Sequence, residues 1–235
     1  MQLDKLLQKH GFGTRRACRA LVRQERIAIN GQICDDPFVE LETNGLIFTV
    51  DGVDWPYAEF ASLILNKPTG YECSRKPLHH PSVLSLLPVQ LRERDVQPIG
   101  RLDEDTTGLL LITDDGQLNH VLSSAKRKVP KVYLATTKHA VDQGQVDQLL
   151  AGVLLNDEPG LISAAACEIA GENLLRITVT EGKYHQVKRM VAAAGNRVEA
   201  LHREAVGELA LPDDLKPGEW RWLTAVDLEK LGYLS

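Results

Sequence analysis

Residues 100–108, Gly-Arg-Leu-Asp-Glu-Asp-Thr-Thr-Gly, place one arginine, three carboxylates and two hydroxyls between two glycines. The apolar run Leu-Leu-Leu-Ile follows directly at 109–112. A polar loop that ends against a buried strand is a place where a rigid scaffold can present reactive groups. A carboxylate in such a loop can attack an anomeric carbon, as in retaining glycosidases. A solvated turn with a threonine at its exit would give the same pattern.

Together with three other segments of the chain, this loop resembles the motifs of a known family. The segments are Leu-Asn-Lys-Pro-Thr-Gly-Tyr at 65–71, the run 100–116, Lys-Val-Tyr at 131–133 and Glu-Gly-Lys-Tyr-His-Gln-Val-Lys-Arg-Met at 181–190. In order and rough spacing they resemble the motifs of the pseudouridine synthases. These isomerases break the N1–C1′ bond of a uridine in RNA, rotate the base and rejoin it through C5. The resemblance therefore implies an enzyme, an isomerase acting on RNA.

The same resemblance implies roles for particular side chains. Asp103 corresponds to the catalytic nucleophile, and Tyr133 to the tyrosine that packs on the target base and is favoured for proton transfer. Lys188 stands where the family has Arg or Lys, and an ion pair with Asp103 would keep that carboxylate ionised. Arg101 corresponds to the residue used around base extrusion. Taken alone, Tyr133 also fits a core position, and Arg101 and Lys188 also fit structural salt bridges.

A hydrolytic glycosidase would need a second carboxylate as general acid, and Asp105 is available. We favour isomerisation, because transfer to C5 requires the base to stay bound in a dry pocket. Asp105 and Glu104 are then expected to orient the loop or face solvent. The isomerisation is redox-neutral, and the sequence has no glycine-rich phosphate loop and no His/Cys cluster at zinc spacing. We therefore expect no metal and no cofactor.

Positive charge is concentrated at the amino terminus although the chain as a whole carries −5. Residues 1–31 contain seven Lys/Arg and two acids, so the remainder is strongly acidic. Leucines at 3, 6 and 7 predict a first helix ending at Gly11, and Thr14 is a predicted cap for a second helix reaching about residue 24. Arginines in this second helix recur every three or four residues, which predicts that they form one stripe along the helix. The apolar residues 17, 18, 21 and 22 are predicted to lie on the opposite side. The stripe consists of Arg15, Arg19, Arg23 and Arg26, with Arg16 beside it.

A small sheet is expected next. Asn30-Gly31 between alternating apolar residues predicts a two-residue hairpin, and a strand at 46–50 ends at Asp51-Gly52. Residues 1–52 resemble the S4 RNA-binding domain, which implies that the arginine stripe meets phosphates. A solvated arginine face without a ligand is the alternative.

We expect an α+β protein with an S4-like RNA-binding domain at 1–55, a linker at 56–61 and a pseudouridine synthase domain at 62–235. The catalytic domain is predicted to hold a mixed, mostly antiparallel sheet flanked by helices, because strands and helices interleave without steady alternation. A capping box is predicted at Thr224 and Asp227. Further RNA contacts are expected from Lys67, Lys131, His185 and Arg189.

Within the family, the sequence resembles most the members that modify uridine 516 of 16S small-subunit ribosomal RNA. The resemblance therefore implies that this RNA, naked or bound to ribosomal proteins, is the partner. A large-subunit target and a non-catalytic S4-type assembly factor are the alternatives. No run approaches the roughly 20 apolar residues of a membrane span, no segment is of signal-peptide type, and the four cysteines are scattered. We expect a cytoplasmic, monomeric protein with reduced thiols and no membrane contact.

Overall fold

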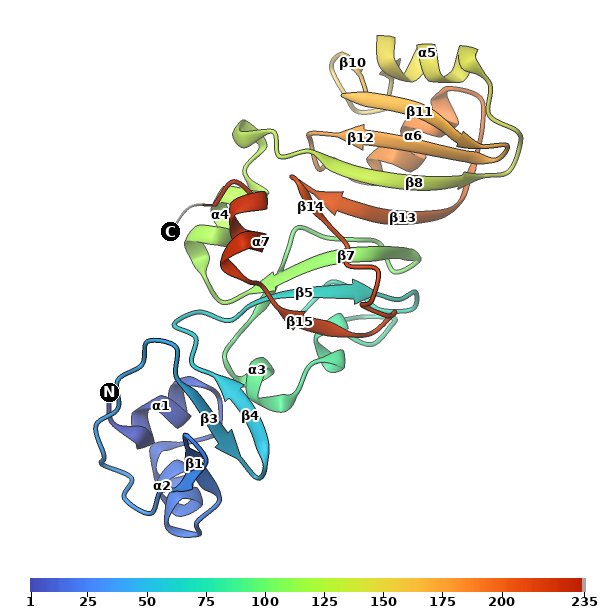
Figure 1. Cartoon of the computed structure of the whole chain (residues 1–235). Coiled ribbons are helices and arrows are strands. Elements are labelled where there is room, and N and C mark those ends of the chain that lie inside the picture. The colour runs from blue at the N-terminus through green and yellow to red at the C-terminus, as the bar shows by residue number, and fades with distance from the viewer. Residues whose placement is uncertain (234–235) are drawn as a thin grey trace. The chain divides into compact units, whose positions relative to one another are not determined.

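The computed structural model describes residues 1–233 of the 235 in the chain. The chain divides into two compact units, drawn in Figure 1: Met1–Ala61 with Leu87–Val96, and Ser62–Leu86 with Gln97–Ser235. Segment 87–96, assigned from the sequence to the catalytic domain, thus belongs to the first unit. The backbone of this segment lies so close to the first unit that a Cβ on Gly11 would meet the carbonyl oxygen of Gln90 at 2.0 Å.

The first unit contains three helices and one small sheet. The helices are α1 (Leu3–Lys9), α2 (Arg15–Arg23) and α3 (Val89–Glu93), and the strands are β1 (Ile27–Ile29), β2 (Gln32–Ile33), β3 (Ile47–Val50) and β4 (Val53–Pro56), in the order β2-β1-β3-β4. Thr14 caps α2 as predicted, accepting a hydrogen bond from the Ala17 amide. The predicted hairpin is confirmed, with positive φ at Asn30 and Gly31. Strand β4 continues through Pro56, so residue 56 is part of the sheet and not of a linker.

The core of the first unit includes a buried histidine. Leu6 and Phe48 are fully buried, and His10 lies among them with its ring edge-on to Phe48. The Nδ1 atom of His10 lies 2.8 Å from the Leu6 carbonyl oxygen, and Nε2 accepts a hydrogen bond of 3.1 Å from the Ala58 amide. Both ring nitrogens are satisfied by a neutral imidazole, and burial lowers the pKa of His10 to about 4.

The second unit is organised around one mixed sheet (Figure 1). Its strand order is β11-β12-β8-β13-β7-β5-β15, with β14 paired to β13 and β6 paired to β7. The strands are β5 (Ser62–Lys67), β6 (Gln97–Ile99), β7 (Thr106–Thr113), β8 (Lys131–Thr137), β11 (Ala166–Gly171), β12 (Leu174–Val179), β13 (Val198–Val206), β14 (Leu209–Ala210) and β15 (Trp220–Trp222). Strands β13 and β7 run parallel, and the other pairings among the described strands are antiparallel. The predicted α+β class with a mostly antiparallel sheet is confirmed.

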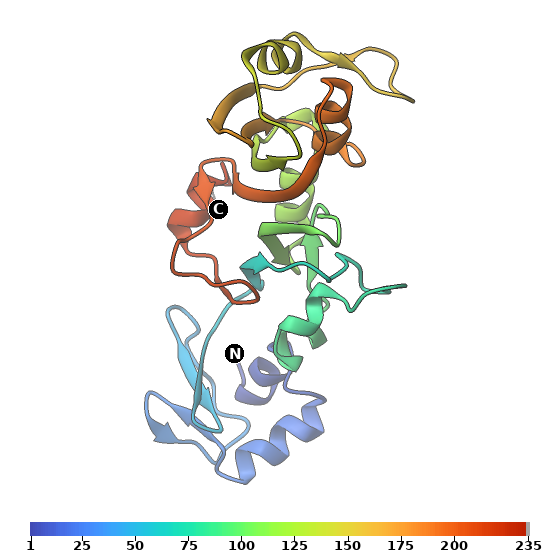
Figure 2. The ribbon, with the colours of Figure 1, turned by 90° about the vertical axis from the view of Figure 1, so that its right-hand side faces the viewer.

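Helices and short segments complete the second unit. They are α4 (Gly116–Ser123), α5 (Gln143–Ala151), α6 (Gln186–Ala193), α7 (Ala225–Lys230), the 3₁₀ turns η1 (Val83–Leu86) and η2 (Ala125–Arg127), and a separate hairpin of β9 (Val153–Leu154) and β10 (Leu161–Ile162). In Figure 2 the yellow β9–β10 hairpin and the blue-green segment after β5 extend away from the body of the sheet. The capping box of α7, Thr224 with Asp227, is present as predicted.

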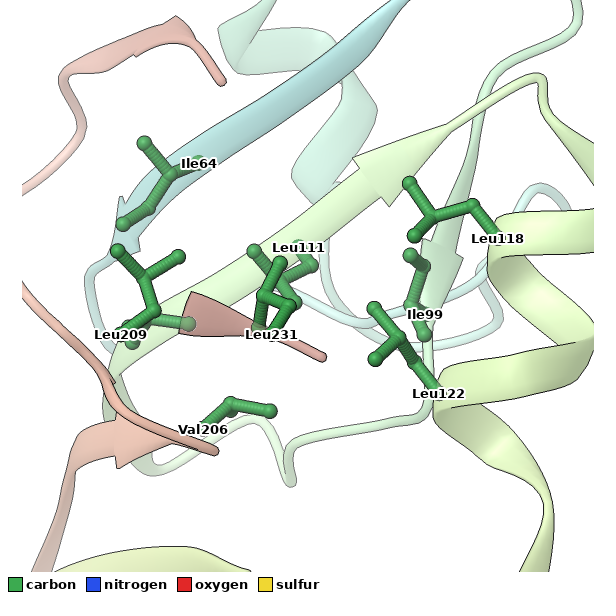
Figure 3. Packing of buried hydrophobic residues seen from close by; sticks show 9 residues of the cluster. Ile64, Ile99, Leu111, Leu118, Leu122, Val206, Leu209 and Leu231 are labelled. Carbon is green, nitrogen blue, oxygen red and sulfur yellow. The ribbon is translucent and has the colours of Figure 1, made fainter. Parts of the chain in front are cut away.

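A buried apolar cluster supports the strands that carry the candidate site. Figure 3 shows Ile64 of β5, Leu111 of β7 and Val206 of β13 in one buried cluster with Leu118 and Leu122 of α4. This cluster anchors the central strands on one side. Among residues 1–233, no helix has the length and apolar character that crossing a bilayer requires.

Candidate active site

The loop that carries Asp103 connects β6 to β7 and is shaped by a buried lysine. Lys67 has no exposed surface, and its ammonium group donates to the carbonyl oxygens of Asp103 at 3.0 Å, Glu104 at 3.1 Å and Thr106 at 2.9 Å. A further hydrogen bond reaches the Pro68 carbonyl at 3.1 Å. The prediction that Lys67 contacts RNA is wrong, because these carbonyls occupy its ammonium group inside the protein. Lys67 instead holds the loop in one shape.

The glycine at the end of the loop is explained by a close approach of two strands. Gly108 has φ +100°, and a Cβ there would lie 2.3 Å from the carbonyl oxygen of Arg203. Strands β7 and β13 run parallel at this point, with Gly108 in register with Arg203. Any larger residue at 108 would separate the strands, so the glycine sets how close Arg203 lies to the loop.

Asp103 is held by two side chains from the start of α6. Lys188 Nζ lies 3.2 Å from Asp103 Oδ2, and His185 Nε2 lies 3.2 Å from Asp103 Oδ1. His185 precedes the helix in a left-handed conformation with φ +48°, which turns its ring toward the loop. The Asp103 side chain is 29% exposed, so it is within reach of a ligand. The structure thus brings Asp103 and Lys188 together, the juxtaposition that the sequence resemblance implied.

Asp105 completes this cluster. Its Oδ1 lies 2.7 Å from Lys188 Nζ. Burial opposes a charged ammonium at Lys188, but the hydrogen bonds and charges of Asp105 and Asp103 outweigh it and raise the Lys188 pKa. Sequence reasoning expected Asp105 to orient the loop or face solvent; the structure shows a half-exposed carboxylate that binds the site lysine.

Tyr133 projects from β8 into the same region. It is 9% exposed, and its hydroxyl lies 3.5 Å from Nη1 of Arg203 on the neighbouring strand β13. Arg203 was not among the residues predicted from the sequence. The sequence signal is limited to its spacing of two residues from Leu201 on one strand, and only the structure shows that both are buried, so that an arginine stands at an inward position.

Asp103, His185, Tyr133 and Arg203 line one cavity of about 630 Å³ in the second unit. Its polar lining includes Arg101, Asp103, Lys131, Tyr133, His185 and Arg203. Apolar side chains of the core, among them Ile99, Leu111 and Leu122, form another part of its wall. A concave, mostly apolar site with a few converging polar groups is typical of a ligand-binding cavity. Among residues 1–233, no His, Cys, Asp and Glu side chains gather in the way a metal site requires.

Comparisons with known proteins agree with this geometry. The family described as RNA pseudouridylate synthase matches residues 61–193, and the S4 domain matches residues 1–45. The chain belongs to the RNA pseudouridine synthases. The "Ribosomal small subunit pseudouridine synthase A" of Yersinia pestis is 39% identical, covering 99% of this chain and 98% of the relative. The "Uncharacterized RNA pseudouridine synthase YtzG" of Bacillus subtilis is 38% identical, covering 98% of each chain.

A solved structure shows that the likeness extends to the fold of the synthase. The structure, described as "Crystal structure of pseudouridylate synthase", has a TM-score of 0.70 at 35% identity and covers 98% of this chain and 99% of its own. Sequence and fold therefore agree over nearly the whole chain.

Other residues that the sequence singled out in the synthase domain have varied surroundings. Arg101 is exposed and lines the cavity, as does half-buried Lys131, whose ammonium donates to the Val129 carbonyl at 3.0 Å. His185 lies against Asp103 and lines the cavity, and its expected contact with RNA stays a prediction. Arg189 was also expected to be an RNA contact. Its guanidinium donates to the backbone carbonyls of Tyr184 and Asn156, so it ties α6 to neighbouring segments of the protein.

The arginine stripe of the S4 unit is also corrected. Arg15 and Arg19 both bind the fully buried carboxylate of Asp4, at 3.2 Å and 2.8 Å. They therefore border the packed face of α2 instead of opposing it. Arg26 lies beyond the end of α2 and pairs with Asp51 at 2.6 Å.

One arginine of the predicted stripe, Arg23, and its neighbour Arg16 remain available at the surface. Arg16 and Arg23 are exposed, and no hydrogen bond or ion pair joins their side chains to any described residue. Ala17, expected on the packed face, is exposed as well. Fewer arginines of this helix have unpaired side chains at the surface than the sequence pattern predicted.

Proposed function

We propose that this synthase converts one uridine of small-subunit ribosomal RNA, uridine 516 of the 16S molecule, into pseudouridine with Asp103 as nucleophile. The observation that carries the proposal is the placement of Asp103 in the cavity, against Lys188 and His185, at 3.2 Å from each. The small-subunit target is supported by relatives such as the Yersinia pestis protein, whose name specifies that substrate.

The geometry supports a defined order of events. The target uridine leaves the RNA helix, at an energy of a few kcal/mol, and enters the cavity. Arg101, exposed at the cavity, is placed to fill the vacated space or hold a phosphate. The base packs on Tyr133, a contact of about 1–3 kcal/mol in stacked RNA–protein pairs.

Asp103 then acts at the sugar. Lys188 and His185 orient its carboxylate, which attacks C1′ while the N1–C1′ bond breaks. The cavity retains the base, which rotates and joins C1′ through C5. The placement of Asp103 serves both an ester at C1′ and a glycal path, since either begins at the sugar. Bonds are exchanged without oxidation or reduction, so we expect the reaction to need no cofactor.

The S4 unit supplies binding to the same RNA. Arg16 and Arg23 present free positive charge at its surface, suited to phosphates. We propose that the synthase works as a monomer in the cytoplasm, on 16S RNA that is naked or partly covered by ribosomal proteins.

The test is a pseudouridine map of 16S RNA transcribed without modifications and incubated with the protein alone. One new pseudouridine, at position 516, is the expected result. Parallel reactions use 16S RNA with bound ribosomal proteins and large-subunit RNA. A new site only in large-subunit RNA would overturn the assignment of substrate, and no new site in any of the three RNAs would contradict the proposed function.

A further inference from the structure

Arg203 is a buried charge without a counter-charge in the protein. Its side chain belongs to a residue only 3% exposed, on β13 between β8 and β7. Nε donates to the Leu109 carbonyl at 2.7 Å, and Nη1 lies 3.5 Å from the Tyr133 hydroxyl. Within residues 1–233, no carboxylate lies at ion-pair distance from it. A guanidinium does not lose its proton in proteins, so the charge itself stays buried, which is unfavourable unless something compensates it.

A second cation lies near it. Lys131 stands two residues before Tyr133 on β8, so both side chains point to the same face of the strand. Burial lowers the pKa of Lys131, and the charge of Arg203 lowers it further. The ammonium group of Lys131 is bound by the Val129 carbonyl, and no described acid pairs with it.

Both cations line the cavity, and the acids of its lining each lie near another cation. Asp103 is held by Lys188 and His185, and Glu181 lies 3.6 Å from Lys183. The wall next to Tyr133 therefore has positive charge in excess. An anionic group that enters the cavity would supply the missing negative charge.

We propose that Arg203, assisted by Lys131, stabilises the negative charge that uracil carries once its N1–C1′ bond has broken. The inference rests on the proposed function. When the Asp103 oxygen bonds to C1′, the electron pair of the N1–C1′ bond goes to the base, where N1, O2 and O4 share it. The glycal path releases the same anion. When C5 bonds to C1′, Asp103 recovers its electron pair, and a proton passes from C5 to N1, so the overall reaction is neutral.

The position of Arg203 favours the base over a phosphate as its anionic partner. The Arg203 guanidinium carbon lies 6.0 Å from the centroid of the Tyr133 ring, the surface on which we place the base. A phosphate stays on the RNA chain, where exposed Arg101 can reach it. Gly108 lets β7 approach the Arg203 backbone closely, so the guanidinium is fixed before the substrate arrives. A fixed charge directed at developing charge contributes most to catalysis.

The first test replaces Arg203 in the full-length chain and needs no activity for its stability readout. For Arg203→Met we expect the urea midpoint of the RNA-free protein to be unchanged or higher, because an uncompensated buried charge is removed. We expect RNA affinity within about 3-fold of wild type and a single-turnover rate lower by about 10²–10³-fold. Arg203→Lys and the less buried Lys131→Met should fold normally and lose less rate. A lower midpoint with unchanged rate in the two milder variants would show a structural role and overturn the proposal.

The second test varies the leaving base. In RNA carrying 5-fluorouridine at the target position, the electron-withdrawing fluorine makes the departing base a more stable anion. Cleavage of N1–C1′, followed by fluorine NMR, should therefore suffer about 10-fold less from Arg203→Met than uridine conversion does. Equal losses for both substrates, or a loss confined to RNA affinity, would overturn the inference. An active wild type with an equally active Arg203→Met contradicts this inference alone, whereas an inactive wild type contradicts the proposed function.

Discussion

The ammonium group of Lys188 lies 2.7 Å from a carboxylate oxygen of Asp105, closer than the 3.2 Å that separates it from Asp103. One lysine from α6 therefore joins two carboxylates of the β6–β7 loop. Asp105 is 57% exposed and Asp103 is 29% exposed, so the more accessible acid holds the lysine in place while the more buried one faces the cavity. We interpret Asp105 as a positioning residue for Lys188.

This arrangement predicts unequal effects of two substitutions. Lys188→Met leaves Asp103 and Asp105 without their shared cation, and we expect the single-turnover rate to fall by about 10²–10³-fold. Asp105→Asn keeps a hydrogen-bond acceptor for Lys188, and we expect a loss of about 10-fold or less. Rates are measured on the same RNA at saturating enzyme. Equal losses would contradict the positioning role, because a residue that only positions Lys188 should matter less than Lys188 itself.

Lys67 is predicted to stabilise the second unit. Lys67→Met removes the ammonium group that donates hydrogen bonds to four carbonyl oxygens in and around the Asp103 loop. We expect the free energy of unfolding to fall by about 3 kcal/mol. Urea denaturation followed by tryptophan fluorescence measures this. A Trp55→Phe background leaves Trp220 and Trp222 as the reporters, both in the second unit. Lys76→Met, at an exposed loop position, is the matched control and should change stability by less than about 0.5 kcal/mol.

RNA binding by the S4 unit should depend on the arginines that the protein leaves unpaired. Arg16→Gln with Arg23→Gln removes two surface charges, and each lost phosphate contact lowers the slope of log affinity against log salt by about 0.7–0.9. Arg26→Gln is the control, because Arg26 is neutralised by Asp51 at 2.6 Å. We expect a clearly smaller change for the control. Identical salt slopes for the double variant and wild type would argue against phosphate contacts on α2.

Acid is predicted to weaken the first unit through His10. The folded-state pKa of His10 is lowered to about 4 from an ordinary 6.5, because burial disfavours the charged ring. Between these values the unfolded chain binds a proton and the folded one does not, so stability is complete above pH 6.5 and falls toward pH 4. The loss should total about 3 kcal/mol. Urea unfolding at several pH values measures it, in a background with Trp220→Phe and Trp222→Phe that leaves Trp55 as the reporter. His10→Gln should show a much flatter profile, and an equally steep one would assign the effect to another group.

Elements with strong local signals were predictable from the sequence. Asn30-Gly31 forms its hairpin, Thr14 caps its helix, and Thr224 with Asp227 forms a capping box, because each depends on residues within a few positions. The periodicity of α2 was also right, but its partners were not. A helical pattern predicts on which side of the helix Arg15 lies. It cannot show that the buried carboxylate of Asp4 pairs with Arg15 on that side.

The predictions about the site divide in the same way, between local motifs and contacts that form only in the folded protein. The motif resemblance brought Asp103 and Lys188 together correctly, since both belong to contiguous strings. Arg203 was missed because its importance depends on two strands, β7 and β8, that become its neighbours only in the folded sheet. Lys67 was assigned to RNA, and only the packed loop shows that its ammonium group is enclosed by carbonyl oxygens.

The central claim is that Asp103 performs the chemistry, and Asp103→Asn tests it most directly. The variant keeps the size of the side chain, and Lys188 retains Asp105 as its partner, so the loop should stay folded. We measure pseudouridine in 16S RNA after incubation with each protein, and RNA affinity in parallel. We predict no pseudouridine from the variant, with an RNA affinity within about 3-fold of that of the wild type. Pseudouridine formation at a rate near that of the wild type would contradict it.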